Sequence, residues 1–362
     1  MGARSSSLCF SSCCHRHAYM TIGDKFMNLA IGWLSGLDAV GQAGASFEEN
    51  MQALGACRAN ISKANEPMYQ KAIQKGGWKV DTKTIMRGAS SGGGSLDILI
   101  HTPAGGTAAN VGAMTLVLWA HGGGMTVGNA REGYGVGLFN DVAAGASGSF
   151  CFASVEYRLA PEAQFPLAVD DMVAAFEALS AADVAADYGY NPGRIGLAGA
   201  SAGAFVAGHA AARLGAASPG AASAAPAFLA MMYPMVDPTC SSASWSAFED
   251  LPSNPGSWLR WSWKALLSGG QDECISEDKL REASLFHIDW SNLKGLKALV
   301  LVADFDTLKD EGSDLGKRLD AAGLDTRLAF GQGSHCLAHK FDDAAGEASL
   351  DWWREVLCEE QR

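Results

Sequence analysis

The segment RIGLAGASAG, residues 194–203, begins as an apolar run typical of a buried strand and ends in the pattern GxSxG. The small-residue run AFVA at 204–207 then has helical character. A sharp turn here would lift Ser201 out of the sheet, and Gly199 and Gly203 would leave room for neighbouring backbone. The segment predicts a nucleophilic serine, although a tight turn in a Gly-rich and Ala-rich chain has the same appearance.

Short β-rich runs alternate with helical segments through the rest of the chain after residue 88. The strands that we expect cover residues 96–101, 115–120, 150–155, 194–198, 228–233, 298–303 and 326–330. These runs show little polar alternation, which is typical of strands covered on both sides. The pattern predicts an α/β fold with a mostly parallel central sheet and helices on both faces.

The N-terminal part has a different character. Apolar residues between positions 24 and 76 recur at three- and four-residue steps, so two or three helices should precede any strand. The Gly/Ser-rich stretch 88–95 then interrupts the pattern. We expect a tail or targeting segment at 1–23, a helical region at 24–87 and a main α/β domain at 88–362.

Residues 1–23 contain two arginines, several serines, three cysteines and no acidic residue. Met1-Gly2 with Ser6 fits an N-myristoylation pattern, and Cys9, Cys13 and Cys14 would offer sites for a second acyl anchor. A transit peptide and a plain tail fit the composition as well. The three interpretations stay open.

Charge and cysteine usage exclude several classes of function. The chain has a net charge of −12 and no Lys/Arg cluster, which argues against a nucleic-acid partner. No apolar stretch approaches the roughly 20 residues of a membrane-spanning helix. The nine cysteines are irregularly spaced, which favours a reducing, intracellular and cytoplasmic setting unless residues 1–23 direct the chain elsewhere. Cys13, Cys14, His15 and His17 lack a spaced second ligand pair, so we expect no metal site.

A second motif, HGGG at 121–124, follows the expected strand 115–120. Consecutive glycines allow backbone amides to converge on one point, as a tetrahedral oxyanion requires. The donors that we predict are the amides of Gly123, Gly124 and Ala202. A flexible loop or a phosphate cradle would also place glycines here, but the Lys-Ser/Thr of a P-loop and the GxGxxG spacing are absent.

Together the motifs resemble one family. HGGG, then YRLAPE at 157–162 with Phe165-Pro166, then GxSxG, in this order, is similar to the hormone-sensitive-lipase family of α/β-hydrolases, which includes microbial esterases and plant carboxylesterases. The similarity runs from about residue 115 to the C-terminus. It implies an α/β-hydrolase fold, with the early helices and the segment 258–267 forming a cap that contributes the acyl pocket.

The resemblance also implies an acid in a motif of the form DxLxDE, which residues 306–311 match, so Asp306 is the expected acid. Asp304 is a rival, and Asp310 fits a helix start. A general base should follow the last strand, where His335 occurs and His339 is the alternative. The order Ser, Asp, His is the one used by this fold.

The chain departs from the family pattern in two places: Ala200 stands where Asp or Thr is usual, and Cys336-Leu337 where Gly-Phe is usual. Both departures bear on the support of the site and the shape of its pocket. The resemblance implies a serine carboxylesterase for short- to medium-chain esters that needs no cofactor and no metal. A non-catalytic small-ligand receptor on the same fold and an amidase or peptidase with the same triad are the alternatives, and the oligomeric state stays open.

Overall fold

The computed structural model describes residues 34–89, 92–105, 114–146, 150–217, 225–271, 273–335 and 344–358, with positions 29, 31, 32 and 112. Within these ranges an eight-stranded sheet has the order β1-β2-β4-β3-β5-β6-β7-β8. The strands are β1 (Trp78–Met86), β2 (Ser95–Pro103), β3 (Met114–Ala120), β4 (Phe150–Val155), β5 (Tyr190–Ala200), β6 (Phe228–Met232), β7 (Lys297–Phe305) and β8 (Asp325–Ser334).

Strand β2 pairs antiparallel with both of its neighbours, β1 and β4. The six strands from β4 to β8 in this order, β3 included, run parallel. The predicted mostly parallel sheet is therefore confirmed, and each of the seven expected strands is present. Strand β1 was not among the expected strands: it lies within the region 24–87 that was expected to be helical, and it forms the edge of the sheet. Its buried and exposed residues partly alternate, so it lacks the continuous apolar run that marks the inner strands.

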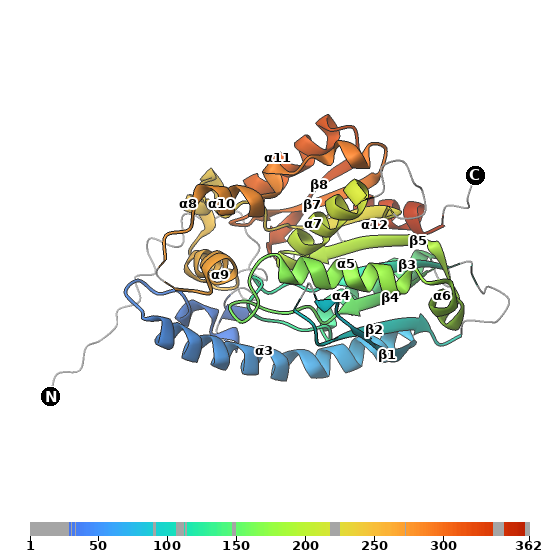
Figure 1. Cartoon of the computed structure of the whole chain (residues 1–362), viewed down its shortest axis with the longest axis horizontal. Coiled ribbons are helices and arrows are strands. Elements are labelled where there is room, and N and C mark those ends of the chain that lie inside the picture. Colours follow the sequence, from blue (N-terminus) through green and yellow to red (C-terminus); the bar gives the residue numbers. More distant parts are fainter. Residues whose placement is uncertain are drawn as a thin grey trace.

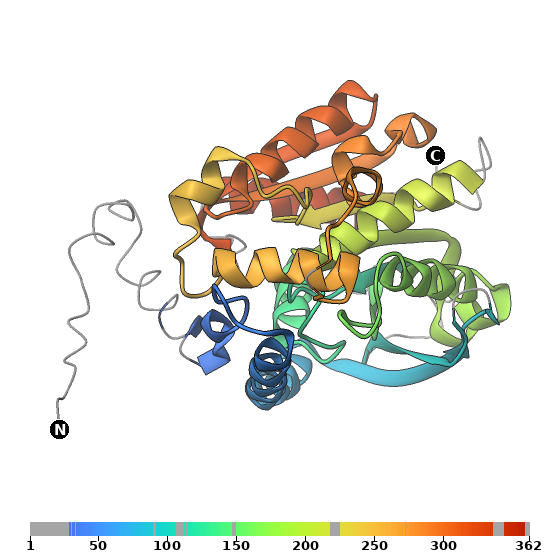
Figure 2. The same ribbon diagram turned by 60° about the vertical axis from the view of Figure 1, so that its left-hand side comes forward.

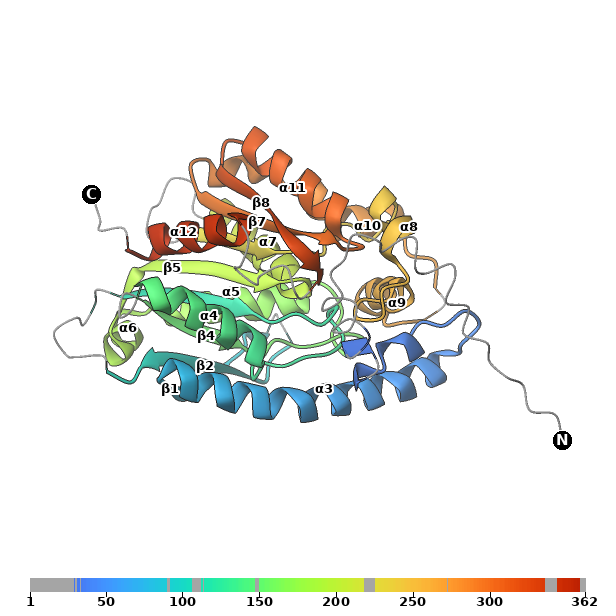
Figure 3. The same cartoon turned by 180° about the vertical axis from the view of Figure 1, so that it is seen from behind.

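Helices cover both faces of the sheet (Figures 1 and 3). The helices on one face are α5 (Leu167–Leu179), α7 (Ala202–Ala217) and α11 (Lys309–Ala321); those on the other are α4 (Gly133–Ala146) and α12 (Ala344–Cys358). Strand β3 alternates between two cores: Leu116 and Leu118 pack in the first, Val117 and Trp119 in the second. Burial on both sides explains why this strand has no polar alternation.

The remaining helices lie mostly beyond one end of the sheet (Figure 2). They are η1 (Leu37–Ala39), α8 (Ala243–Phe248), α9 (Gly256–Ser268) and α10 (Glu277–Ala283), with the short η4 (Leu285–His287) and η5 (Trp290–Leu293), while α6 (Ala182–Tyr188) precedes β5. The longest helix, α3 (Phe47–Gly76), begins in a capping box between Ser46 and Glu49. It starts among these helices and then runs along the sheet, where Tyr69 hydrogen-bonds to His101 of β2 at 3.0 Å.

No helix in the described ranges is both long and apolar enough to span a bilayer. Residues 1–23, with the lipidation, transit and metal-ligand patterns, lie outside the described residues. Their three interpretations therefore stay as they stood from the sequence.

Candidate active site

The turn between β5 and α7 holds Ser201 in a left-handed conformation, with φ 55°. Its amide donates to the Met232 carbonyl oxygen at 2.8 Å. A Cβ on Gly203 would lie 2.0 Å from the Ala120 oxygen, and one on Gly199 would lie 2.3 Å from the Gly203 carbonyl. These close backbone approaches explain why glycines flank the serine, as the GxSxG spacing predicts.

Three predicted site residues meet in one hydrogen-bonded chain. His335 Nε2 lies 2.9 Å from Ser201 Oγ, and His335 Nδ1 lies 2.6 Å from Asp306 Oδ2. The residues follow the C-terminal ends of β5, β7 and β8, which meet at one edge because these strands are parallel. All three side chains are buried. An Nδ1–H that donates to Asp306 leaves Nε2 to accept the serine hydroxyl, the arrangement a general base requires.

The glycine loop after β3 lies against this serine turn. A Cβ on Gly122 would be 3.3 Å from the Ala200 oxygen. Gly123 and Gly124 have φ values of 116° and 57°, both in the left-handed region. The amides of Gly123, Gly124 and Ala202 donate no hydrogen bond to another residue in the part of the chain that the structure describes. They are therefore available to an oxyanion beside Ser201.

The comparison with protein families is decisive at this point. A family model described as the alpha/beta hydrolase fold matches residues 117–341, a range that holds Ser201, Asp306 and His335. The chain belongs to this family. The resemblance inferred from the HGGG and GxSxG motifs is thereby confirmed.

Two relatives and one solved structure illustrate the similarity. An AB hydrolase superfamily protein of Schizosaccharomyces pombe is 30% identical over 61% of this chain and 62% of that protein. Carboxylic ester hydrolase LipN of Mycobacterium tuberculosis is 30% identical over 69% of this chain and 62% of that protein. The chain thus spans less than two thirds of either relative. A thermostable esterase from Pseudomonas putida ECU1011 shares the fold, with a TM-score of 0.69 at 24% identity over 91% of this chain and 97% of that one.

In this α/β-hydrolase, Asp306 has two further partners. Its Oδ1 accepts the Leu308 amide at 3.0 Å and the Asn254 side-chain amide at 3.4 Å. Asn254 lies in the turn between α8 and α9 and is 1% exposed. Sequence reasoning missed Asn254, because nothing in its local sequence points across the 52 residues that separate it from Asp306.

The rival acids have other roles in the fold. Asp304 pairs with Lys309 at 3.4 Å, and both side chains are about one third exposed. Asp310 accepts the amide of Ser244 at 2.8 Å, so it supports the start of α8 as well as lying in the first turn of its own helix. Neither carboxylate is bonded to His335. The rival base His339 and the departure Cys336-Leu337 lie outside the described residues.

A tyrosine covers the imidazole. The ring of Tyr233 lies 4.7 Å from that of His335 at an interplanar angle of 56°. Tyr233 follows β6 with a φ of 35°, and its hydroxyl donates to that of Tyr134 on α4. The ring therefore limits where the imidazole can move. Its contact with His335 arises only because the fold places β6 and β8 on either side of β7, so the sequence carried no signal for it.

An aromatic pair supports the glycine loop from below. The rings of His121 and Tyr157 stack at 4.2 Å, and the Tyr157 hydroxyl donates to the His121 carbonyl at 2.7 Å. His121 Nδ1 lies 2.7 Å from the Gly122 carbonyl oxygen, to which it donates when protonated there. Burial lowers the pKa of His121 to about 4, so this ring is neutral at pH 7. The histidine of HGGG thus supports the loop structurally and does not contact Ser201 in the hydrogen-bonded chain.

Proposed function

We propose that this protein is a serine carboxylic ester hydrolase, in which Ser201 is the nucleophile, His335 the general base and Asp306 the residue that orients the histidine. The observation that carries the proposal is the hydrogen-bonded chain Ser201–His335–Asp306, which lies next to loop amides that have no partner among the described residues. The ester-hydrolase name of one relative is consistent with this chemistry.

In the first half-reaction, the Ser201 oxygen attacks the ester carbonyl carbon while its proton passes to His335 Nε2. The amides of Gly123, Gly124 and Ala202 bind the resulting oxyanion, and a donor of this kind is typically worth about 3 kcal/mol in the transition state. The intermediate then expels the alkoxide, which takes the proton from His335. An acyl-enzyme and a free alcohol remain.

In the second half-reaction, water attacks the acyl carbon and gives its proton to His335. The same amides bind the second oxyanion. Collapse of this intermediate returns the proton to the Ser201 oxygen, and the carboxylic acid leaves. Asp306 keeps its hydrogen bond to His335 and stabilises the imidazolium that forms twice per cycle.

We further propose a short- to medium-chain acyl group. The Trp258 ring of α9 is so close to Gly124 that a Cβ there would lie 2.6 Å from it. Ser201 is 5% exposed and Trp258 4% exposed, which leaves little room for a long chain beside the loop. A series of nitrophenyl esters should show highest kcat/KM for short and medium acyl chains; a strong preference for long chains would contradict this.

The nucleophile is tested with a fluorophosphonate probe, which labels activated serines. The wild type and Ser241→Ala, a change at an exposed serine, should be labelled, whereas Ser201→Ala should not. Equal labelling of Ser201→Ala would reject the assignment. Matched amide and ester substrates, measured in parallel, distinguish an esterase from an amidase or peptidase. Ligand binding without turnover would favour a receptor.

A further inference from the structure

The loop that carries the oxyanion donors is held from outside the sheet by two helices. Thr126 follows the glycines by two residues and is fully buried. Its amide donates to the Gly123 carbonyl at 3.0 Å, which closes the loop into a turn. The Ala160 amide donates to Met125 at 2.8 Å, so the loop is also tied to the segment 157–162.

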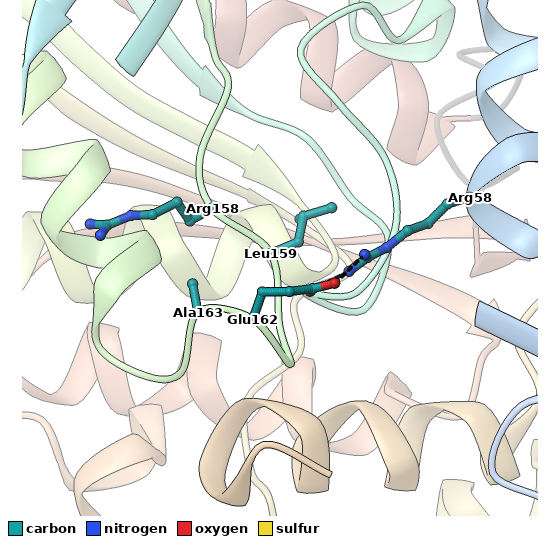
Figure 4. Close-up of a pocket in the computed structure, with 5 residues that line it drawn as sticks. All are labelled: Arg58, Arg158, Leu159, Glu162 and Ala163. Atoms are coloured by element: carbon teal, nitrogen blue, oxygen red, sulfur yellow. Dashed lines mark hydrogen bonds and ion pairs between the residues drawn. The ribbon is translucent and has the colours of Figure 1, made fainter. Parts of the chain in front are cut away.

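Arg58 of α3 contacts the same residue from one side. Its Nε donates to the Thr126 carbonyl at 2.7 Å, and its Nη2 donates to the Ala160 carbonyl at 2.8 Å. The guanidinium also forms a bidentate pair with Glu162, at 2.7 and 2.8 Å. Arg58 and Glu162 line a cavity of about 330 Å³ together with Arg158, Leu159 and Ala163 (Figure 4). The planar guanidinium of Arg58 thus hydrogen-bonds to two loop carbonyls and one carboxylate at once.

Helix α9 reaches Thr126 from another side. The Trp258 Nε1–H donates to Thr126 Oγ1 at 3.1 Å, and Ser262 Oγ lies 3.4 Å from the same oxygen. Trp258 and Ser262 are 4% and 0% exposed, so water does not compete for these bonds. The amide, carbonyl and hydroxyl of Thr126 are therefore all committed, each to a different partner.

We infer that α3 and α9 position the oxyanion donors through their hydrogen bonds to Thr126, with Arg58 and Trp258 as the positioning residues. The inference rests on the proposed function. Oxyanion donors act only when they lie about 3 Å from the developing charge, and a misplacement of about 1 Å can cost 10²-fold in rate. Because both half-reactions form an oxyanion, losing either support should slow acylation and deacylation alike, so that kcat falls while KM changes little.

The test compares variants at these contacts. Arg58→Met keeps the apolar stem but loses the bonds to Thr126 and Ala160, and Thr126→Val keeps the shape but loses the hydroxyl. For hydrolysis of nitrophenyl acetate, we expect kcat to fall about tenfold or more and KM to stay within about twofold. Labelling by the fluorophosphonate, whose phosphoryl oxygen occupies the oxyanion site, should slow by a similar factor.

Two controls separate positioning from simple attachment of the helix. Thr126→Ser keeps the hydroxyl and should restore most of kcat. Glu162→Gln removes the charge partner of Arg58 but leaves both carbonyl bonds, so its kcat should stay within about twofold of wild type. Thermal unfolding shows which variants fold; if Arg58→Met does not, Thr126→Val and Thr126→Ser provide the comparison.

Wild-type kcat in both Arg58→Met and Thr126→Val would overturn the inference, as would an equal loss in Thr126→Val and Thr126→Ser. A loss in Glu162→Gln as large as in Arg58→Met would assign the effect to the ion pair instead. A wild type that turns over no ester and takes up no fluorophosphonate would reject the proposed function, which is a different outcome from either.

Discussion

Asp306 shows how much of the site depends on the orientation of one side chain. One carboxylate oxygen receives His335, and the other receives the Leu308 and Asn254 amides. Because Oδ1 accepts the bonds from these two amides, the carboxylate is held with Oδ2 facing the imidazole. Asp306 therefore fixes both the rotation and the tautomer of His335.

Replacing Asp306 by Asn should preserve the geometry but put a hydrogen-bond donor where the carboxylate oxygen accepts from His335 Nδ1. An amide NH₂ opposite Nδ1 would favour the tautomer with the proton on Nε2, which cannot accept the Ser201 proton. In a serine protease the same exchange lowers kcat by about 10⁴, and we expect a fall of about 10³ to 10⁴ here. Steady-state kinetics check this, with Asp304→Asn as the matched control. A loss of similar size in Asp304→Asn would contradict the assignment.

The residues of the site divide by whether their contacts can be anticipated from local sequence. Ser201 and His335 follow expected strands, and Asp306 matches a family motif, so all three could be named without coordinates. Asn254 and Tyr233 could not, because their contacts with Asp306 and His335 depend on how distant loops and strands approach each other. The motifs encode the reacting groups, whereas the packing of the fold selects their supports.

At the scale of secondary-structure elements, the glycine loop is constrained by what packs on it. Gly124 and Gly77 have similar φ values, 57° and 65°, but different surroundings. A Cβ on Gly124 would meet Trp258 at 2.6 Å, whereas one on Gly77, at the end of α3, would meet nothing within 4 Å. The pair separates the cost of a left-handed backbone from the cost of a steric clash.

Gly124→Ala should therefore lower both stability and activity, and Gly77→Ala should lower stability alone. The strained backbone costs on the order of 1 kcal/mol at both positions, and the clash adds about 1–3 kcal/mol at Gly124. Because the loop must shift away from Trp258, we expect kcat of Gly124→Ala to fall about 100-fold. Urea unfolding and ester kinetics measure the two effects. Wild-type kcat in Gly124→Ala would show that the loop tolerates the methyl group.

The elements themselves were predictable to different degrees. The inner strands are buried on both faces, so each produced an apolar run that the sequence displays. Strand β1 is exposed along much of one face, and α9 reaches the loop only through tertiary packing. Strand β1 was therefore missed, and the place of α9 beside the site was expected only through the family resemblance.

At the scale of the whole molecule, a buried carboxyl couples stability to pH. Glu311 is 2% exposed and accepts hydrogen bonds from the Trp245 indole and the Asp237 amide. It thereby joins α11, α8 and the segment after β6. Burial raises its pKa to about 8 from an ordinary value of 4.5, although both hydrogen bonds oppose the shift.

Between pH 4.5 and about 8 the folded state holds a proton on Glu311 that the unfolded chain has released. The contribution of this group to stability is full below pH 4.5 and is lost as pH rises through about 8, at up to about 1.4 kcal/mol per pH unit. Glu311→Gln should remove that slope. Urea unfolding of both proteins at pH 5, 6.5 and 8 checks this: the difference in unfolding free energy should shift in favour of the variant as pH rises. A constant difference would mean that Glu311 is ionised in the fold.

Helix α3 links the loop that carries Thr126 to distant parts of the fold. Its 30 residues extend about 45 Å; Arg58 lies in its N-terminal half, and Tyr69 and Ala72, nearer its end, bond to β2 and α4. Pro67 removes one of its backbone hydrogen bonds, but the bonds of Tyr69 and Ala72 lie directly beyond it. The helix is therefore a fixed support that connects Thr126 to β2 and α4. Because Trp258 of α9 also donates to Thr126, displacement of α9 would remove one of the two helix contacts of Thr126, whereas the contact with Arg58 of α3 would remain.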